Sequence, residues 1–135
     1  MQNILQLSNQ TTKIYKVAMY IRLSREDGDK DESTSITNQR NILIRFINNH
    51  ENFIIVDEYV DDGWTGTNFN RPGFKRMIND IESGKINTVI VKDLSRLGRE
   101  SSETLYYYQK YFPEQQIRFI AINDAIDTAR KFRYE

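Results

Sequence analysis

Apolar residues occur along the chain in two alternating patterns. Residues 15–23, 53–59, 86–91 and 117–122 are short runs rich in Val, Ile and aromatic side chains. Runs of this length and composition are typical of strands buried in a sheet. The pattern therefore predicts four strands, separated by longer segments of helical periodicity.

Two of those longer segments have clear helical signals. Between residues 38 and 49 the apolar positions recur at helical spacing, and either Ser33 or Ser35 is placed to cap the start. A second helix begins at Pro72, a residue favoured in the first helical turn, and stops at Gly84. Each segment carries one apolar stripe, which predicts that it packs on the sheet through one face.

A third helix is predicted from about Ser102 to Tyr111, with Ser101 or Ser102 as its cap. We expect it to end before Pro113, because proline has no N–H to donate and its ring clashes with the preceding turn. Gly98, shortly before this helix, permits a close approach of the backbone.

Because strands and helices alternate, successive strands should be joined by right-handed crossovers. We expect an α/β fold of three layers, in which a mostly parallel sheet has helices on both faces. The expected strand order is 2-1-3-4, with or without an extra edge strand. This order places the first and third strands side by side at a switch point, where the carboxyl ends of the strands form a ligand crevice.

Composition excludes several classes of site. The 135 residues fit one domain with a real core. The chain has no Cys and a single His, which excludes a disulfide framework and the usual Cys/His zinc sites. A Ser-His-Asp triad would have to use His50, and we interpret His50 as a solvated residue in a polar connection.

The charge balance limits the possible partners. The 19 Lys and Arg equal the 19 Asp and Glu, so the chain has little general attraction for DNA, and another segment would have to deliver that substrate. Residues 1–13 lack the features of a secretory signal, and no stretch is long enough to span a bilayer. We expect a soluble, cytoplasmic protein with no membrane partner.

Polar, reactive side chains follow two of the predicted strands. Tyr20-Ile21-Arg22-Leu23-Ser24 closes the first strand, and Asp93-Leu94-Ser95-Arg96-Leu97-Gly98-Arg99 follows the third. Arg22 and Ser24 are two residues apart, so they project from the same side of an extended strand. A serine hydroxyl and several guanidinium groups are therefore expected to converge at the crevice.

This combination suits attack on a phosphodiester. A serine hydroxyl is a weak nucleophile, and negative charge shifts onto the phosphate oxygens and the leaving group in the transition state. Arginine binds phosphate oxygens through a planar fork and stays protonated. Preorganised cations are usually the largest catalytic contribution. Arg22, Arg96, Arg99 and Arg71 would supply this charge without a metal.

Each of these residues also has a plainer structural interpretation. Ser24 would serve as a turn former or a helix cap. Arg22 would pair with Asp61 or Asp62 at the neighbouring strand end. Residues 96–99 would form a solvated turn that leads into a helix. The coincidence of several polar groups at adjacent strand ends favours the catalytic interpretation.

The same residues resemble the catalytic domain of the serine recombinases, the resolvase/invertase family, over residues 16–127. Ser35 and Gln39 resemble the family's Ser-x-x-x-Gln, and Arg96 and Arg99 resemble the paired arginines of its Asp-Arg-Leu-Gly-Arg motif. The other matching positions are Tyr20, Arg22 and the nucleophile Ser24, the turn Asp62-Gly63-Trp64-Thr65-Gly66, and Arg71 before Pro72-Gly73-Phe74.

The resemblance implies a resolvase-like fold and a site-specific DNA recombinase. By this likeness Ser24 attacks a DNA phosphate, forms a 5′-phosphoserine link and releases a 3′ hydroxyl, with no cofactor, metal or ATP. The implied partners are double-stranded DNA and further copies of the chain, as a homodimer that assembles into a homotetramer in a bacterial cell. The implied site residues are, for catalysis, Ser24, Arg22, Arg96, Arg99 and Arg71, and, for support or substrate binding, Tyr20, Gln39, Ser35, Thr65, Asp62, Asp93 and Ser95.

Two further features concern the organisation of the chain. The long segment 25–34 and the sequence Lys92-Asp93-Leu94-Ser95-Arg96 resemble those of the large serine recombinases of mobile elements. We expect residues 1–14 to form a flexible tail. Residues 15–135 are then a catalytic domain that ends before the family's dimerisation helix and DNA-binding domains, and is inactive without them.

The sequence departs from the family pattern at Ser95, where many relatives carry Asp. Serine cannot act as a carboxylate acid or base. Asp93 lies two residues away and, on a strand, would share that side. The group that donates a proton to the leaving oxygen is therefore left unassigned.

Three alternatives belong to other functional classes. A receiver-type signalling domain would use Asp61, Asp62 and Lys92, but it leaves the arginines unexplained. A metal-dependent nuclease would use Asp61, Asp62 and Asp93, and would be sensitive to a chelator. A non-catalytic assembly module would keep the fold alone.

Overall fold

The computed structural model describes residues 13–24 and 35–129. Most of the expected tail, the segment 25–34 and, within it, the alternative cap Ser33 lie outside the described residues. Within the described part, the alternation of strands and helices is confirmed.

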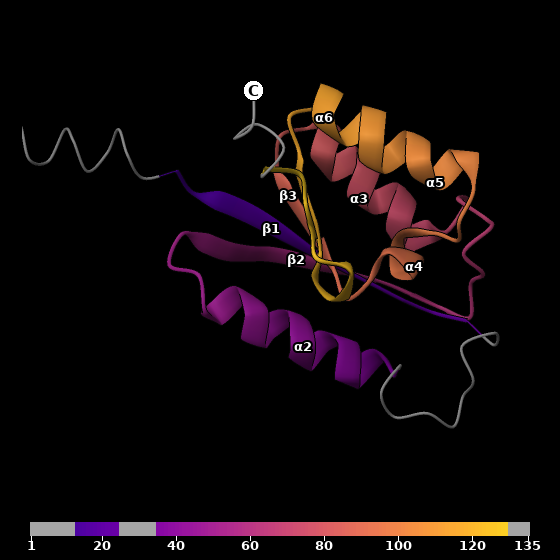
Figure 1. Cartoon of the computed structure of the whole chain (residues 1–135), viewed down its shortest axis with the longest axis horizontal. Coiled ribbons are helices and arrows are strands. Elements are labelled where there is room, and N and C mark those ends of the chain that lie inside the picture. Colours follow the sequence, from indigo (N-terminus) through magenta and orange to yellow (C-terminus); the bar gives the residue numbers. More distant parts are fainter. Residues whose placement is uncertain (1–12, 25–34, 130–135) are drawn as a thin grey trace, which may run out of the picture.

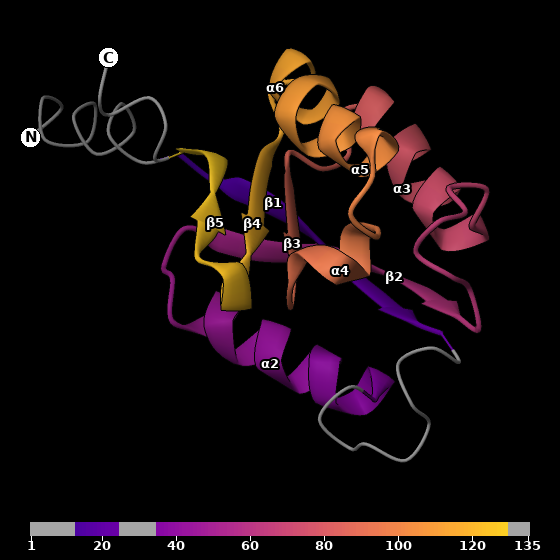
Figure 2. The same ribbon diagram turned by 45° about the vertical axis from the view of Figure 1, so that its right-hand side comes forward.

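The sheet contains β1 (Tyr15–Leu23), β2 (Phe53–Asp62), β3 (Thr88–Val91), β4 (Arg118–Ala121) and β5 (Ile126–Asp127). Their spatial order is β2-β1-β3-β4-β5. The first four strands are parallel, and β5 pairs antiparallel with β4. The predicted 2-1-3-4 order is confirmed, and β5 is the extra edge strand, visible beside β4 in Figure 2.

The helices form layers on both faces of this sheet (Figure 1). Helix α2 (Ile36–Asn48) covers one face. Helix α3 (Pro72–Glu82) and the helical segment that starts with α5 (Ser102–Tyr106) cover the other. The single turn α4 (Leu94–Leu97) lies at the carboxyl end of β3. The molecule is therefore the three-layer α/β fold that the sequence predicts.

Alternation along the strands divides the core between the two faces. Val17, Met19 and Ile21 of β1 pack with Leu43 and Ile47 of α2. The intervening residues of β1 point to the other face, where the core mixes aromatic side chains with aliphatic ones. The buried side chains of that second cluster include Ala18, Tyr20, Tyr59, Phe74, Met77, Phe112 and Phe119.

Two of the predicted caps are confirmed. The Oγ of Ser35 accepts a hydrogen bond of 3.0 Å from the backbone N–H of Asn38, at the start of α2. The Oγ of Ser101 accepts from the N–H of Thr104, at the start of α5. Each bond satisfies one of the N–H groups that a helix start leaves without an internal partner.

The prediction that the third helix ends before Pro113 is wrong. Helix α5 continues through the π-helical segment η3 (Tyr107–Tyr111) into α6 (Phe112–Glu114), which contains Pro113. The N–H of Phe112 donates to the carbonyl of Tyr107, five residues earlier. The wider π turn precedes the proline, where a regular α turn would press the proline ring against a carbonyl. The chain thus accommodates Pro113 within the helix instead of ending before it.

Strand β2 is an edge strand with an irregularity in its middle. Val17 pairs with Ile55 and Ala18 pairs with Asp57, so Val56 is an extra residue that forms a β-bulge. Before the bulge, Ile54 and Ile55 are 51% and 39% exposed. After it, Asp57 and Glu58 form ion pairs with side chains of the neighbouring helices.

His50 is exposed in the connection between α2 and β2, as predicted. Its ring stacks on Phe53 and its Nδ1 lies 2.8 Å from the carbonyl of Phe46. Within the described part of the chain, no helix is both long enough and apolar enough to cross a bilayer.

Candidate active site

Ser24 lies directly after β1, at the carboxyl edge of the sheet. The preceding residue, Leu23, pairs with Asp62 at the end of β2, and its carbonyl accepts from the N–H of Gly63. Ser24 is only 5% exposed. The expected nucleophile therefore occupies the expected strand end, but it is buried in this arrangement.

Arg22 joins the end of β1 to α4. Its guanidinium group donates to the carbonyl oxygens of Ser95 and Arg96, at 2.5 and 3.2 Å, and to that of Trp64 at 2.9 Å. The carbonyl oxygens at the end of a helix have no partner within the helix. Arg22 satisfies two of these acceptors and so fixes α4 against β1.

The carbonyl oxygen of Arg22 is itself held by two side chains. It accepts from the Nε2 of Gln39 at 3.0 Å and from the Nη1 of Arg96 at 3.2 Å. Gln39 is fully buried on α2, and Arg96 is buried on α4. The end of β1 is thus clamped from both sides of the sheet, one residue before Leu23 and two before Ser24.

Arg71, just before α3, is fully buried and holds the same turn from another direction. It donates to the carbonyl of Leu97 at 2.6 Å, to that of Arg96 at 3.4 Å and to that of Asn68 at 2.7 Å. Its guanidinium group also lies 4.5 Å from the ring centre of Phe69. The opposite end of α4 is held as well, because the N–H of Leu94 donates to a carboxylate oxygen of Asp124.

Tyr20 links Arg71 to a buried carboxylate. Its hydroxyl accepts from Arg71 at 2.9 Å and donates to Asp61 at 2.7 Å. The carboxylate of Asp61 also accepts from the N–H groups of Gly73 and Phe74, in the first turn of α3. Asp61 therefore caps α3 from the end of β2. These contacts are with Tyr20 and α3, and they do not match the plainer interpretation in which Arg22 pairs with Asp61.

The environment of Tyr20 favours its neutral form. Burial raises the pKa of its hydroxyl well above the ordinary value, the Arg71 charge lowers it, and the Asp61 carboxylate raises it. A protonated hydroxyl is what this site requires, because Tyr20 must donate to Asp61 while it accepts from Arg71.

The expectation that Asp93 and Ser95 share one side of a strand is wrong. Asp93 precedes α4 in extended conformation, and Ser95 lies within the helical turn. The turn brings the side chains together, since the hydroxyl of Ser95 donates to a carboxylate oxygen of Asp93. The other carboxylate oxygen lies 3.6 Å from the Nε of Arg96. Asp93 therefore contacts both residues, but through helical geometry.

The remaining predicted residues lie farther out. Arg99 and Asp62 are exposed. The hydroxyl of Thr65 lies 2.6 Å from that of Thr67 and also accepts from the N–H of Thr67, in the turn after β2. Ser35 serves as the cap of α2. The structure thus gathers Tyr20, Arg22, Gln39, Arg71 and Arg96 around α4 and leaves Arg99, Asp62 and Thr65 nearer the surface.

Comparison with known proteins identifies the family. The family model "Resolvase, N terminal domain" matches residues 17–133. This chain belongs to the resolvase family of serine recombinases. It is 31% identical over 110 residues to the serine recombinase Gin of Escherichia phage Mu. The match covers 82% of this chain and 48% of Gin. The chain thus spans about half the length of the curated relatives that it matches.

Solved structures agree with this assignment. The crystal structure of the N-terminal catalytic domain of TP901-1 integrase is 36% identical, with a TM-score of 0.75 over 84% of this chain and 82% of that one. A resolvase family site-specific recombinase from Streptococcus pneumoniae is 31% identical, with a TM-score of 0.69 over 87% and 78%. The fold of the chain is therefore that of the serine recombinase catalytic domain.

The alternative functions are not supported. Among residues 13–24 and 35–129, no three His, Cys, Asp or Glu side chains gather so as to hold a metal ion. Asp61, which both the receiver and the nuclease would need, is turned to the start of α3 and to Tyr20. In this resolvase-family chain Asp61 thus serves the fold at the position where both alternatives need it as a ligand.

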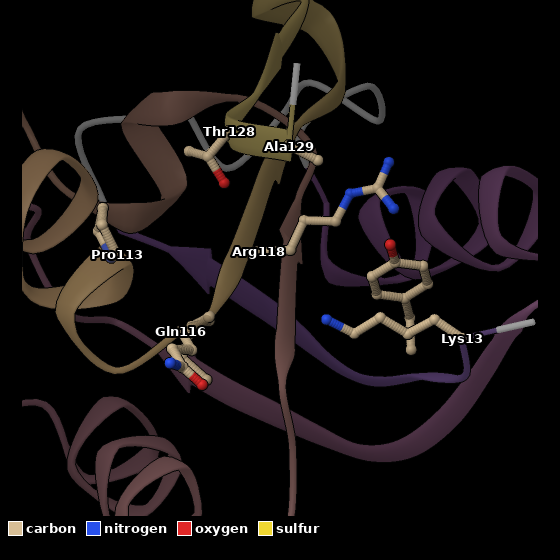
Figure 3. Close-up of a pocket in the computed structure, with 8 residues that line it drawn as sticks. Lys13, Pro113, Gln116, Arg118, Thr128 and Ala129 are labelled. Atoms are coloured by element: carbon tan, nitrogen blue, oxygen red, sulfur yellow. The ribbon is translucent and has the colours of Figure 1, made fainter. Parts of the chain in front are cut away.

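A cavity of about 370 Å³ lies at the opposite edge of the sheet, where β1 and β4 begin (Figure 3). Tyr15, Arg118 and Thr128 are among the residues that line it. Arg118 donates to both carboxylate oxygens of Asp127, at 3.0 and 2.7 Å. Because parallel strands end at the other edge, this cavity is separate from the site around α4.

Sequence reasoning missed several residues that build the site. The backbone carbonyls of residues 95–97 are the acceptors for Arg22 and Arg71, and no side-chain pattern marks them. Thr104 and Asp124 were also missed. A weak signal existed for Asp124, because an acidic residue after the fourth strand falls at the same edge of the sheet as the end of the third.

Proposed function

We propose that the chain is the catalytic domain of a site-specific DNA recombinase, in which the Oγ of Ser24 attacks a DNA phosphodiester. Family membership supports the activity. The observation that carries the assignment to Ser24 is its place at the end of β1, with Arg22 and Arg96 bonded to each other's backbone two residues earlier. Three guanidinium groups, those of Arg22, Arg71 and Arg96, meet at this edge.

The proposed step exchanges one phosphate ester for another. A bond forms between the Oγ of Ser24 and phosphorus, and the bond from phosphorus to the 3′ oxygen breaks. The hydroxyl of Ser24 loses its proton, and the released 3′ oxygen gains one. Because the number of ester bonds is unchanged, a 3′ hydroxyl can later reverse the step and rejoin the strands without ATP.

The arginines would divide the work between them. Arg22 and Arg71 hold α4 through its carbonyl oxygens, so we propose that they set the position of Arg96 and add positive potential from the interior. Arg96 and the exposed Arg99 would contact phosphate oxygens. Asp93 contacts both Ser95 and Arg96, so a carboxylate lies next to one of the two arginines that we propose to contact phosphate.

The burial of Ser24 sets a condition on the reaction. A side chain that is 5% exposed cannot meet the phosphate of a duplex without a local opening. We propose that the end of β1 opens when the protein assembles on DNA. This would keep the nucleophile covered until both partners of the reaction are in place.

The partners follow from the same proposal. The substrate would be double-stranded DNA, brought by parts of the protein other than this formally neutral chain. A homodimer that pairs into a homotetramer, in the cytoplasm of a bacterial cell, would perform strand exchange. We also propose the large, mobile-element type of recombinase, and a catalytic domain over residues 15–135 preceded by a tail.

The test is a covalent adduct. The natural full-length protein is incubated with a DNA duplex that carries its recombination site, and the protein–DNA adduct is digested and mapped by mass spectrometry. We expect a phosphoserine at Ser24, formed equally well in the presence of a chelator and absent in Ser24→Ala. The matched control is His50→Ala, which we expect to form the adduct normally. An adduct at another residue would refute the proposal.

Arg96→Ala and Arg99→Ala test the charge in the same assay. Each variant should keep the fold, as judged by circular dichroism. Each should lose about 100-fold in cleavage rate, the usual effect of removing one preorganised donor, roughly 3 kcal/mol. Undiminished cleavage in either variant would remove that arginine from the proposed mechanism.

A further inference from the structure

Arg99 combines an exposed side chain with a firmly held backbone. Its N–H donates to the carbonyl of Gly66 at 3.0 Å, and its own carbonyl accepts from the hydroxyl of Thr104. Gly66 belongs to the turn after β2, and Thr104 to the first turn of α5. Both polar groups of this one residue are therefore fixed by segments far apart in the sequence from each other.

The Gly66 side of this arrangement leaves no space. A Cβ on Gly66 would lie 2.7 Å from the Cγ of Arg99, 2.9 Å from its backbone nitrogen and 3.0 Å from the Nη2 of Arg22. The turn that contains Gly66 and the segment that contains Arg99 can approach so closely only because residue 66 has no side chain. The turn after β2 thus reaches both Arg99 and Arg22.

The Thr104 side is equally close. Thr104 is 1% exposed, and a Cβ on Gly98 would collide with its Oγ1 and lie 2.5 Å from the Cζ of Phe69. Its backbone N–H is satisfied by the cap Ser101, and Ser101 also donates to the Thr104 hydroxyl at 3.2 Å. The proton of the Thr104 hydroxyl is therefore directed at the Arg99 carbonyl.

We infer that Thr104 is a positioning residue for the recombinase reaction, acting through the backbone of Arg99. The inference rests on the proposed function, in which Arg99 binds a phosphate oxygen. A long exposed side chain costs less entropy to bring to its target when its backbone is already fixed. The Thr104 hydroxyl and the Gly66 carbonyl provide this fixation from the two sides.

The first experiment tests, in the chain alone and without DNA, whether the Thr104 hydroxyl fixes the backbone of Arg99. The variant is Thr104→Val, which keeps the shape of the side chain and removes the hydroxyl. We expect the NMR order parameter of the Arg99 amide to fall from a value typical of rigid backbone, about 0.85, to one typical of flexible backbone, below about 0.6. Thr104→Ser should restore the wild-type value. An order parameter that does not change in Thr104→Val overturns the inference.

The second experiment measures the reaction in the full-length protein. Thr104→Val should slow formation of the Ser24 adduct by roughly 10- to 100-fold, as expected for a misplaced contact group, and Thr104→Ser should recover most of the rate. The matched control is Thr88→Val, which removes a hydroxyl from another fully buried threonine, one that bonds to Asn87 at the start of β3. It should react at the wild-type rate.

The outcomes separate the inference from the proposed function. If the wild-type protein forms no Ser24 adduct, the proposed function fails, and the NMR result still decides whether Thr104 fixes the backbone of Arg99. If the wild type reacts and Thr104→Val reacts at the same rate, the positioning role fails while the function stands. If Thr88→Val slows the reaction as much as Thr104→Val does, the effect comes from general loss of stability and the inference is also overturned.

Discussion

The two faces of the sheet are packed with different chemistry. The buried residues under α2 are aliphatic, with Val17, Met19 and Ile21 against Leu43 and Ile47. The face under α3 and α5 adds buried aromatic rings to aliphatic side chains, and towards the strand ends its core passes into hydrogen-bonded Tyr20, Arg22, Asp61 and Arg71. One strand, β1, supplies both faces through alternate residues.

Because of this difference, we expect the two faces to contribute in different ways to stability and to the geometry of the candidate active site. Apolar packing under α2 depends on area and shape and tolerates changes of similar volume. The network on the other face depends on direction, because each buried donor needs its acceptor. A substitution on the first face should therefore change mainly the free energy of unfolding, whereas one on the second should also move α4 and the arginines that it carries.

The largest effect is expected from Arg71→Ala. The change leaves the buried carbonyl of Leu97, the carbonyl of Asn68 and the Tyr20 hydroxyl without the donor that Arg71 supplies, and it opens a cavity. We expect the free energy of unfolding, measured in urea, to fall by about 4 kcal/mol. Arg71→Lys serves as a second, milder variant for the adduct assay at 25 °C, because it keeps the charge but not the fork. Wild-type stability and adduct formation in Arg71→Lys would contradict the role in holding α4.

A somewhat smaller effect is expected from Leu43→Ala on the aliphatic face. Removal of the buried side chain should cost about 3 kcal/mol, from lost burial and the cavity that remains. Adduct formation per folded molecule should equal that of the wild type. A loss of cleavage beyond the loss of folded protein would show that the two faces are coupled and would break the comparison.

The smallest effect is expected from Tyr20→Phe, which removes one hydroxyl and should cost about 1–2 kcal/mol at neutral pH. The pKa of Tyr20 is raised in the folded state, so its contribution is fully present below the unfolded value of about 10 and is lost as the pH rises above it. The wild type should therefore lose stability more steeply than Tyr20→Phe in urea unfolding series above pH 10. Parallel curves would contradict this.

Other tyrosines limit the size of that pH difference. Burial also raises the pKa of Tyr59 and Tyr111, whose hydroxyls donate to Asp80 and Glu82. They contribute alkaline instability of the same sign, so Tyr20→Phe should reduce the slope without abolishing it.

The fold could be predicted from the sequence because periodicity reports burial directly. The run that contains β1 is apolar or aromatic from Val17 to Ile21, that of β3 is apolar from Val89 to Val91, and the two strands are neighbours as expected. The failure at Pro113 has a physical cause. Proline forbids a regular α turn, but packing of Phe112 and Tyr108 against Phe119 keeps the segment on the sheet, and a π turn satisfies both constraints.

The site could be predicted only as far as side chains mark it. Residue types and their spacing pointed to Arg22 and Ser24, two positions apart, and to the pair Arg96 and Arg99. The grip of Arg22 and Arg71 on the carbonyls of α4 was not, because backbone acceptors carry no sequence signal. The contact of Ser95 with Asp93 likewise depends on a single helical turn that four residues are too few to predict.

The bulge at Val56 also has a consequence for handling the protein. Beyond it, the ion-paired Asp57 and Glu58 make the free side of β2 unattractive to another strand, whereas the isoleucine-rich half before it has neither charge nor irregularity. Aggregation of concentrated samples should therefore start at that half-strand, and a lysine in place of Ile54 should improve solubility without touching the chemistry at the other end of the sheet.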